Sequence, residues 1–151
     1  MVKEKVEEGI EYIYSGGELI SIILRSNFHK DEITFFTPDT LSQQLGYLPH
    51  KKGDIIQAHR HIYNKREVHY TQEVLFVKKG KVKVNLYDSR KKYIGSEIIQ
   101  TGDFILLCGG AHGFEFLEDS ILIEIKQGPY TGEQDKERFQ GVENAGEEKE
   151  R

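Results

Sequence analysis

Apolar residues recur at every second position in short runs along this chain, and turn residues such as Gly, Asp and Ser separate the runs. Alternation with a period of two predicts β-strands that bury one face. Before position 130, no run of ten or more residues has the apolar spacing of a helix. The sequence therefore predicts an all-β fold. The expected strands cover residues 10–14, 18–24, 31–36, 55–61, 67–79, 82–87, 93–99, 104–107, 112–117 and 121–127.

The amino-terminal end differs from this strand-rich middle. Residues 1–9 are charged and contain few apolar side chains, so we expect a flexible lead-in or a short helix there. The alternating runs that follow predict a single domain over residues 10–128. A chain of 151 residues is long enough to bury one core of its own without disulfides or structural metals.

The carboxy-terminal end, residues 129–151, is rich in Glu, Lys, Gln and Gly and is expected to form a polar tail. A short helix over residues 135–139 is expected within it, with Tyr130 and Phe139 as anchors. Beyond about Gly141 the composition is too polar to bury a core, which predicts disorder.

Cysteine usage and hydropathy indicate the cellular compartment in which we expect this protein. Cys108 is the one cysteine, which rules out an intrachain disulfide and a cysteine-rich zinc site and fits a reducing cytoplasm. The first thirty residues lack the pattern of a secretory leader, and no window approaches the roughly 18 consecutive apolar residues of a membrane span. We therefore expect a cytoplasmic protein with no membrane partner.

Charge is distributed unevenly along the chain. The formal net charge is −4, yet residues 50–95 contain twelve Lys or Arg against four acidic residues. Lysines on the solvated faces of strands explain most of this excess, and attraction of an anionic small molecule is the second explanation. A nucleic-acid partner is not expected, because the pI is about 5.9 and no nucleic-acid-binding motif is present.

Two histidines in the expected strand 55–61 have the spacing of metal ligands. Side chains alternate across a strand, so His59 and His61 project from one face while Arg60 points outwards as a surface charge. Two imidazoles together with a carboxylate hold a first-row divalent metal and leave positions free for water or substrate. The sequence therefore predicts a metal site.

The carboxylate expected at this site is Glu73. It shares one face of the expected strand 67–79 with Leu75 and Val77, so it points where the core residues point. A buried charge is costly unless it is paired or bound to a metal. His69 shares the face but lies four residues away, about 13 Å along a strand, so we expect it at the mouth of the site.

Once these turns and ligands are placed, the chain resembles the cupin superfamily. The first cupin motif runs Gly, five residues, His-x-His, three or four residues, Glu, six residues, Gly. Here Gly53, His59, His61, Glu73 and Gly80 follow that order with those spacings, except that eleven residues separate His61 from Glu73. A longer hairpin accommodates the insertion without changing the faces on which the ligands lie.

The second cupin motif runs Gly, five residues, Pro-x-Gly, two residues, His, three residues, Asn. In this chain Gly102 is followed by five residues and then by Cys108-Gly109-Gly110-Ala111-His112. Cys108 stands in place of the proline, the turn is one residue shorter, and Phe116 occupies the position of the Asn. The glycines and His112 are retained.

The resemblance implies a double-stranded β-helix, which is a jelly-roll barrel, with a divalent metal held by His59, His61, Glu73 and His112. Zn, Fe, Mn, Ni and Co all suit this ligand set, so the ligands do not identify the metal. Cupins include isomerases, epimerases, dioxygenases, decarboxylases and non-catalytic sensors. The fold alone therefore leaves the reaction open.

We favour an isomerase or epimerase acting on a small, polar, carbohydrate-related substrate that is anionic or sugar-like. Glu73 and His69 are the expected catalytic residues, and Tyr63, His69 and Tyr70 are the expected substrate-binding residues, although aromatic side chains in strands also serve in packing. A non-haem iron dioxygenase and a non-catalytic ligand-binding protein remain alternatives. His29 and His50 are expected to be surface residues.

The apolar run at residues 19–24 suggests an oligomer as well. Such a strand-rich amino terminus is suited to pairing across a two-fold axis, as in many small cupins, so we expect a homodimer. Cys108 is expected to be a turn residue without chemistry of its own.

Overall fold

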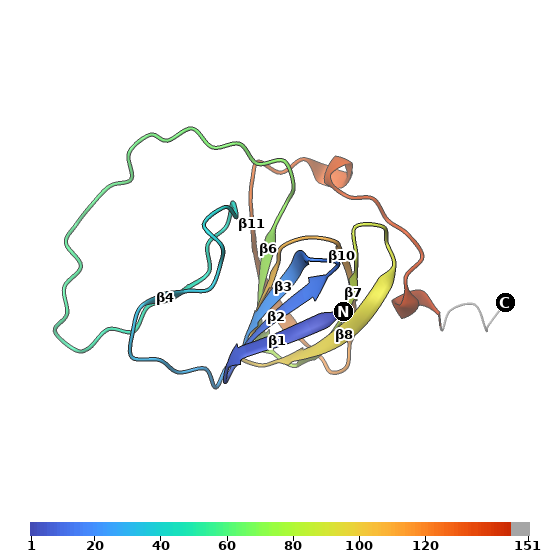
Figure 1. The fold of residues 1–151 in the computed structure, drawn as a ribbon, viewed down its shortest axis with the longest axis horizontal. Helices are drawn as coiled ribbons and strands as arrows, with labels where there is room; N and C mark the ends of the chain where they lie inside the picture. Colours follow the sequence, from blue (N-terminus) through green and yellow to red (C-terminus); the bar gives the residue numbers. More distant parts are fainter. Residues whose placement is uncertain (146–151) are drawn as a thin grey trace.

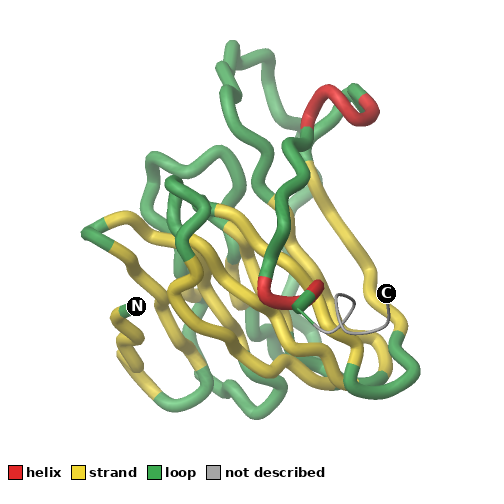
Figure 2. Tube along the Cα trace, turned by 90° about the vertical axis from the view of Figure 1, so that its right-hand side faces the viewer, coloured by secondary structure: helices red, strands yellow, loops and turns green. Residues whose placement is uncertain are grey.

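The computed structural model describes residues 1–145, and in this range the protein is all-β, as the alternation predicts. The strands are β1 (Val2–Glu7), β2 (Ile10–Ser15), β3 (Glu18–Leu24), β4 (Thr34–Phe35), β5 (Gly46–Tyr47), β6 (Glu73–Lys79), β7 (Lys81–Tyr87), β8 (Tyr93–Gln100), β9 (Phe104–Leu107), β10 (Ala111–Phe116) and β11 (Ile121–Lys126). Two short 3-10 helices follow, η1 (Gly132–Asp135) and η2 (Val142–Asn144). Figure 2 shows both in the carboxy-terminal segment, outside the strands.

The strands form two larger antiparallel sheets. One has six strands in the order β1-β2-β3-β9-β6-β11, the other has three in the order β10-β7-β8, and β4 and β5 form a separate small pair. In Figure 1 the six-stranded sheet lies beside the three-stranded sheet, with β1 running towards β8. In the described range the two sheets do not join into a closed barrel, because β10 and β11 each end their sheet as an edge strand.

The main core lies between the two sheets. Alternate residues of each strand point inwards, so that Leu75 and Val77 of β6 meet Val82, Val84 and Leu86 of β7. These side chains are almost fully buried, as the alternation predicts. Burial of aliphatic side chains at about 25 cal/mol per Å² supplies the main stabilisation of the fold.

A second core covers part of the outer face of the six-stranded sheet. The segment 25–47, which contains β4 and β5, folds over β2, β3 and β9. Phe28 is central to it, because its ring makes edge-to-face contacts with Phe36 and Tyr47 at centroid distances of 5.2 and 5.0 Å. β3 is therefore buried on both faces and paired along both edges, so residues 19–24 are not free to pair with a second copy.

The amino-terminal residues form a strand, and the prediction of a flexible lead-in or short helix is wrong for Val2–Glu7. β1 pairs with β2 along the edge of the six-stranded sheet, a position that needs no buried face. Lys3 explains why a charged segment is ordered here. Its Nζ lies 2.8 Å from Glu11 of the same sheet and 2.7 Å from Glu97 of β8, and so bridges the two sheets.

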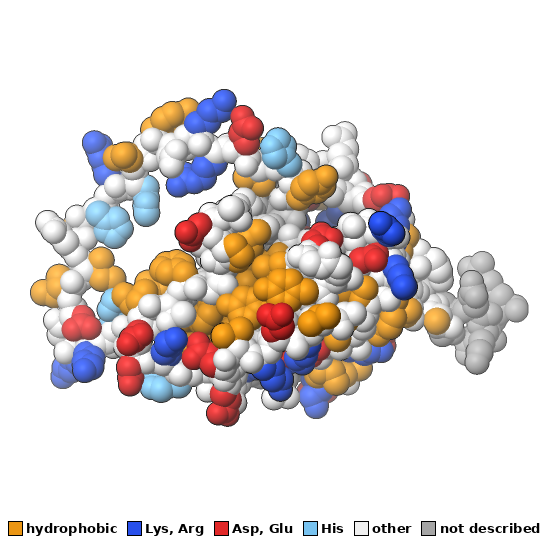
Figure 3. All heavy atoms as spheres, in the orientation of Figure 1, with side chains coloured by type: hydrophobic (Ala, Val, Ile, Leu, Met, Phe, Trp, Pro, Cys, Tyr) orange, Lys and Arg blue, Asp and Glu red, His pale blue; other side chains and the backbone are white. Residues whose placement is uncertain are grey.

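The expected strand 55–61 is absent, and β6 begins at Glu73 rather than at residue 67. Residues 48–72, here called the long loop, contain one turn, in which the Asp54 backbone N–H donates to Lys51 at 3.0 Å, and no strand. Alternation alone does not make a strand without a neighbour to accept its hydrogen bonds. Figures 1 and 3 show the long loop arching away from the body with open space beneath it.

The carboxy-terminal tail is partly ordered and covers the outer face of the three-stranded sheet. Phe139 packs edge-to-face on Tyr87 at 5.1 Å, so its predicted role as an anchor is confirmed, whereas Tyr130 is 83% exposed and anchors nothing. The helix expected over residues 135–139 is wrong, because η1 ends at Asp135. The predicted disorder beyond Gly141 is wrong for η2, and residues 146–151 lie outside the described range.

Two glycines of the cupin-like motifs are required by close packing as well as by backbone geometry. Gly80 (φ +98°) turns β6 into β7, and a Cβ there would lie 2.2 Å from the hydroxyl of Ser120. Gly110 (φ +61°) approaches the carbonyl oxygen of Tyr87, which would lie 2.1 Å from a Cβ. The Gly110 turn leads directly into β10, which carries His112 as its second residue.

Candidate functional site

Glu73 and His112 form a pair between the two sheets. Glu73 is the first residue of β6, and its side chain lies on the same face as Leu75 and Val77. His112 is the second residue of β10, opposite the buried Leu86 of β7, so it also points inwards. The His112 Nε2 lies 3.2 Å from the Glu73 Oε2. The inward direction predicted for Glu73 is confirmed, and its buried charge is compensated by an imidazole.

The surroundings of Glu73 favour its ionised form. The hydrogen bond from His112 lowers the pKa of Glu73 below its usual value, and this effect outweighs burial, which raises it. The positive charges of His112, Lys136 and Lys126 lower the pKa further. An ionised carboxylate that is 9% exposed and faces an imidazole is a ready pair of ligands for a divalent cation.

His59 and His61 lie apart from this pair. Both are exposed on the long loop, with ring centroids 5.4 Å apart, and the His59 Nδ1 contacts the Gln57 carbonyl oxygen at 3.0 Å. Among residues 1–145, no group of three or more His, Cys, Asp or Glu side chains is arranged to hold a metal ion. The structure therefore brings the four predicted ligands together as two separate pairs.

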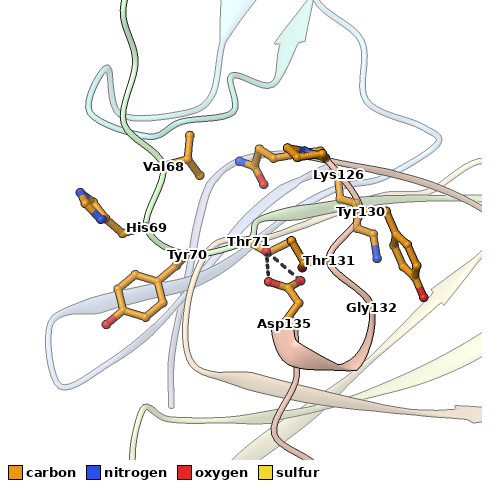
Figure 4. A pocket seen from close by; sticks show the side chains of 12 residues that line it. Val68, His69, Tyr70, Thr71, Lys126, Tyr130, Thr131, Gly132 and Asp135 are labelled. Carbon is orange, nitrogen blue, oxygen red and sulfur yellow. Dashed lines mark hydrogen bonds between the residues drawn. The ribbon is translucent and has the colours of Figure 1, made fainter.

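Two of the three predicted substrate-binding residues line one pocket, of about 240 Å³. His69 and Tyr70 belong to it, whereas Tyr63 lies further back on the long loop and is exposed. The lining residues are Val68, His69, Tyr70, Thr71, Lys126, Gln127, Gly128, Pro129, Tyr130, Thr131, Gly132 and Asp135. Figure 4 shows this pocket, with the loop before β6 on one side and the chain after β11 on the other.

The pocket adjoins the Glu73–His112 pair. Lys126, which lines the pocket, is the direct partner of Glu73 in the β11–β6 register. The neighbouring backbone N–H of Gln72 donates to the Gln127 side chain at 2.8 Å. Thr71, one residue earlier, hydrogen-bonds with Asp135. Thr71 and Gln72 make these contacts in place of the strand pairing expected for residues 67–79. The contacts also fix one end of the long loop beside the pocket.

Among the pocket residues missed in the sequence, those with a charged or aromatic side chain are Lys126, Tyr130 and Asp135. Lys126 ends a run that alternation already predicts as a strand, but nothing in one sequence shows that this strand pairs with the segment carrying Glu73. Tyr130 and Asp135 lie in the tail, where a polar composition gives no periodic signal. Their position depends on the turn after β11, which directs the chain back over Thr71.

The remaining candidates behave as surface or turn residues. In the part of the chain that the structure describes, His29 lies near one carboxylate, Asp31 at 3.5 Å, and His50 near one, Asp54 at 3.7 Å. Burial raises the pKa of Cys108 to about 12, so its thiol stays protonated and is a poor nucleophile.

Among the residues described, no helix has the length and apolar character needed to cross a bilayer. Comparisons of the chain with protein-family models, with curated proteins and with solved structures gave no match.

Proposed function

We propose that this protein is a cupin-like, metal-dependent enzyme acting on a small, polar, carbohydrate-related substrate, with isomerisation or epimerisation as its chemistry. The observation that supports this best is the Glu73–His112 pair, a buried carboxylate and an imidazole facing each other at one end of the sheets. In this proposal they form half of a divalent metal site. His59 and His61 form the other half.

Completion of the site requires residues 55–61 to dock as a strand on the free edge of β10. In the described range this edge has no partner, so its backbone groups are available to another strand. The segment carries large apolar side chains that are poorly suited to water: Ile55 is 90% exposed and Ile62 is 79% exposed. Docking on β10 would complete the barrel and bring His59 and His61 beside His112.

The length of the long loop permits this movement. Eleven residues separate His61 from Glu73, and an extended chain spans about 3.3 Å per residue, or about 36 Å in all. The loop end at Thr71 and Gln72 is held by Asp135 and Gln127, so it need not move. Docking would therefore change the loop and leave the two sheets as they are.

The donor set fits Zn, Fe, Mn, Ni or Co. A bound ion would supply a Lewis acid that polarises an oxygen of the substrate. The chain itself contributes an ionised carboxylate at Glu73, held by His112, and a wall that orients a ligand. His69, on the pocket wall next to Tyr70, is the side chain to which we assign proton exchange with that ligand.

Metal titration followed by calorimetry tests the proposal. We expect His61→Ala and His112→Ala each to weaken binding of Zn²⁺ or Mn²⁺ by about 100-fold or more, because loss of a ligand costs more than the roughly 10- to 100-fold effect of outer-shell changes. His29→Ala is the matched control and should bind as the wild type does. Equal affinity in all four proteins, or no binding at all, would contradict the metal site.

Turnover is tested separately. Metal-loaded protein should exchange a substrate proton with solvent deuterium, detected by NMR, for at least one sugar phosphate or nucleotide sugar. A protein that binds metal and sugar without exchange would favour the ligand-binding alternative, and oxygen consumption with iron would favour the dioxygenase.

We further propose that the protein forms a homodimer through β1. β1 is the exposed edge strand of the six-stranded sheet. Residues 19–24, which the sequence predicted as the dimer contact, belong to β3 inside that sheet, so we assign the contact to β1 instead. The measured mass in solution at micromolar concentration should be twice 17.5 kDa. A monomeric mass would rule the dimer out.

A further inference from the structure

The pocket beside Glu73 presents polar groups of a particular kind. We propose that it binds an uncharged sugar ring, recognised by Asp135 and by the face of Tyr130. This inference rests on the proposed function, because it takes the carbohydrate-related ligand from there. Beyond that function, the inference states which part of the ligand binds away from the metal, and it names the residues that select this part.

Asp135 provides an acceptor with unused capacity. Thr71 Oγ1 lies 2.8 Å from the Asp135 Oδ1 and 2.9 Å from the Oδ2, but one hydroxyl donates only one proton. Within residues 1–145, no other side chain or backbone group donates to this carboxylate. At least one oxygen of Asp135 is therefore free to accept from a ligand hydroxyl, while Thr71 fixes its direction.

Aromatic rings flank this acceptor. Figure 4 shows Tyr130 on one side of the Thr71–Asp135 pair and Tyr70 on the other, with the Tyr70 ring directed away from Asp135. Their rings are 83% and 85% exposed, although large aromatic side chains are usually at least half covered. A sugar ring has an apolar C–H face that packs on an aromatic face, and its rim of hydroxyls suits a carboxylate.

The charges around the pocket argue against a charged ligand. Lys126 is the cation in the lining, and its Nζ already pairs with Glu124 at 3.1 Å. An anion would meet the Asp135 carboxylate, and a cation would meet Lys126. A hydroxyl group suits both, because it donates to Asp135 and accepts from Lys126.

The test uses the full chain in its metal-free and metal-loaded forms, with NMR titration of glucose, galactose, mannose and N-acetylglucosamine as methyl glycosides. At least one should bind and shift the resonances of Thr71 and Asp135. Asp135→Asn should weaken binding by about tenfold, the effect of losing a hydrogen bond to a charged group. Tyr130→Ala should weaken it as well, whereas Tyr130→Phe, which keeps the ring, should not.

Asp39→Asn, an exposed aspartate elsewhere, is the control and should bind as the wild type does. Inorganic phosphate and tetramethylammonium are the charged probes. The proposal is overturned if either charged probe shifts the pocket resonances while the glycosides do not, or if Asp135→Asn and Tyr130→Ala leave sugar affinity unchanged.

Failure here is distinguishable from failure of the proposed metal site. Metal binding that depends on His61 and His112, together with no glycoside binding, would overturn only the sugar pocket. Glycoside binding in protein that takes up no metal would leave the pocket standing and remove the metal-dependent enzyme.

Discussion

At the level of single residues, Glu73 and His112 face each other between the sheets for different physical reasons. Glu73 alternates in step with Leu75 and Val77 in the sequence, so the three side chains share one face of the strand, and all three are buried. In the sequence, only the altered second cupin motif points to His112 as a site residue. The turn at Gly110 and the register with β7 direct it inwards, and these are long-range properties.

The Glu73–His112 pair predicts a defined pH dependence. The folded-state pKa of Glu73 is lowered from its ordinary value of 4.5, so the pair stabilises the fold above that value and the stabilisation is lost as the pH falls through the folded pKa. Glu73→Gln should therefore cost about 1 to 3 kcal/mol at pH 7 and progressively less below pH 4.5. Urea unfolding of both proteins measures this, and a difference that does not change with pH would contradict it.

Tyr87 reports on the docking of the tail. Burial and the hydrogen bond that it donates to Glu143 at 2.6 Å raise the pKa of Tyr87 to about 12. Glu143→Ala removes the acceptor and loosens η2, so the pKa of Tyr87 should fall towards 10.0. Absorbance at the tyrosinate band follows the titration. Glu137→Ala, which removes an exposed partner of Lys91, should leave it unchanged.

At the scale of elements, strands with close neighbours were predictable and the long loop was not. The runs at β2 and β3, and those at β7 and β8, are joined by short turns, so each strand pairs with its neighbour in the chain. Residues 55–61 have similar alternation, but the partner proposed for them, the free edge of β10, lies some fifty residues further along the chain. Local periodicity carries no information on whether such a distant pairing forms.

Metal binding should order this segment. In metal-free protein the amides of residues 55–61 have no strand partner and should exchange with deuterium at the rate of an unstructured chain. Addition of Zn²⁺ should protect alternate amides of this segment, because an edge strand offers every second N–H to its neighbour.

Hydrogen exchange read by mass spectrometry makes this measurement. His112→Ala should abolish the protection, and His50→Ala, at the start of the loop, should retain it. Protein that binds Zn²⁺ through His61 while residues 55–61 stay unprotected would disprove docking on β10.

At the scale of the whole molecule, the two sheets are held together at one side and separate at the other. β1 and β8 are joined by Lys3, whereas β10 and β11 remain edges. Arg25, just after β3, lies at the centre of the joined side. Its guanidinium contacts Glu11 at 2.9 Å, Asp103 at 3.1 Å and the Ile98 carbonyl oxygen at 2.6 Å. One cation therefore links β2 and β8 with the turn that precedes β9.

Arg25→Met should accordingly destabilise the protein by about 3 kcal/mol or more, because it leaves Glu11 and Asp103 buried without their main counter-ion. The arginine holds the pKa of Glu11 below 4.5, so the wild type loses this contribution as the pH falls through the folded pKa of Glu11. In the variant the unpaired charge of Glu11 is instead relieved by protonation, and the difference in unfolding free energy between the two proteins should narrow from pH 7 to pH 4. Urea unfolding across this range is the measurement, with Lys30→Met, which removes an exposed pair to Glu7, as the control expected within about 0.5 kcal/mol. A loss below about 1 kcal/mol, or a constant gap, would mean that apolar packing alone joins the sheets at this side.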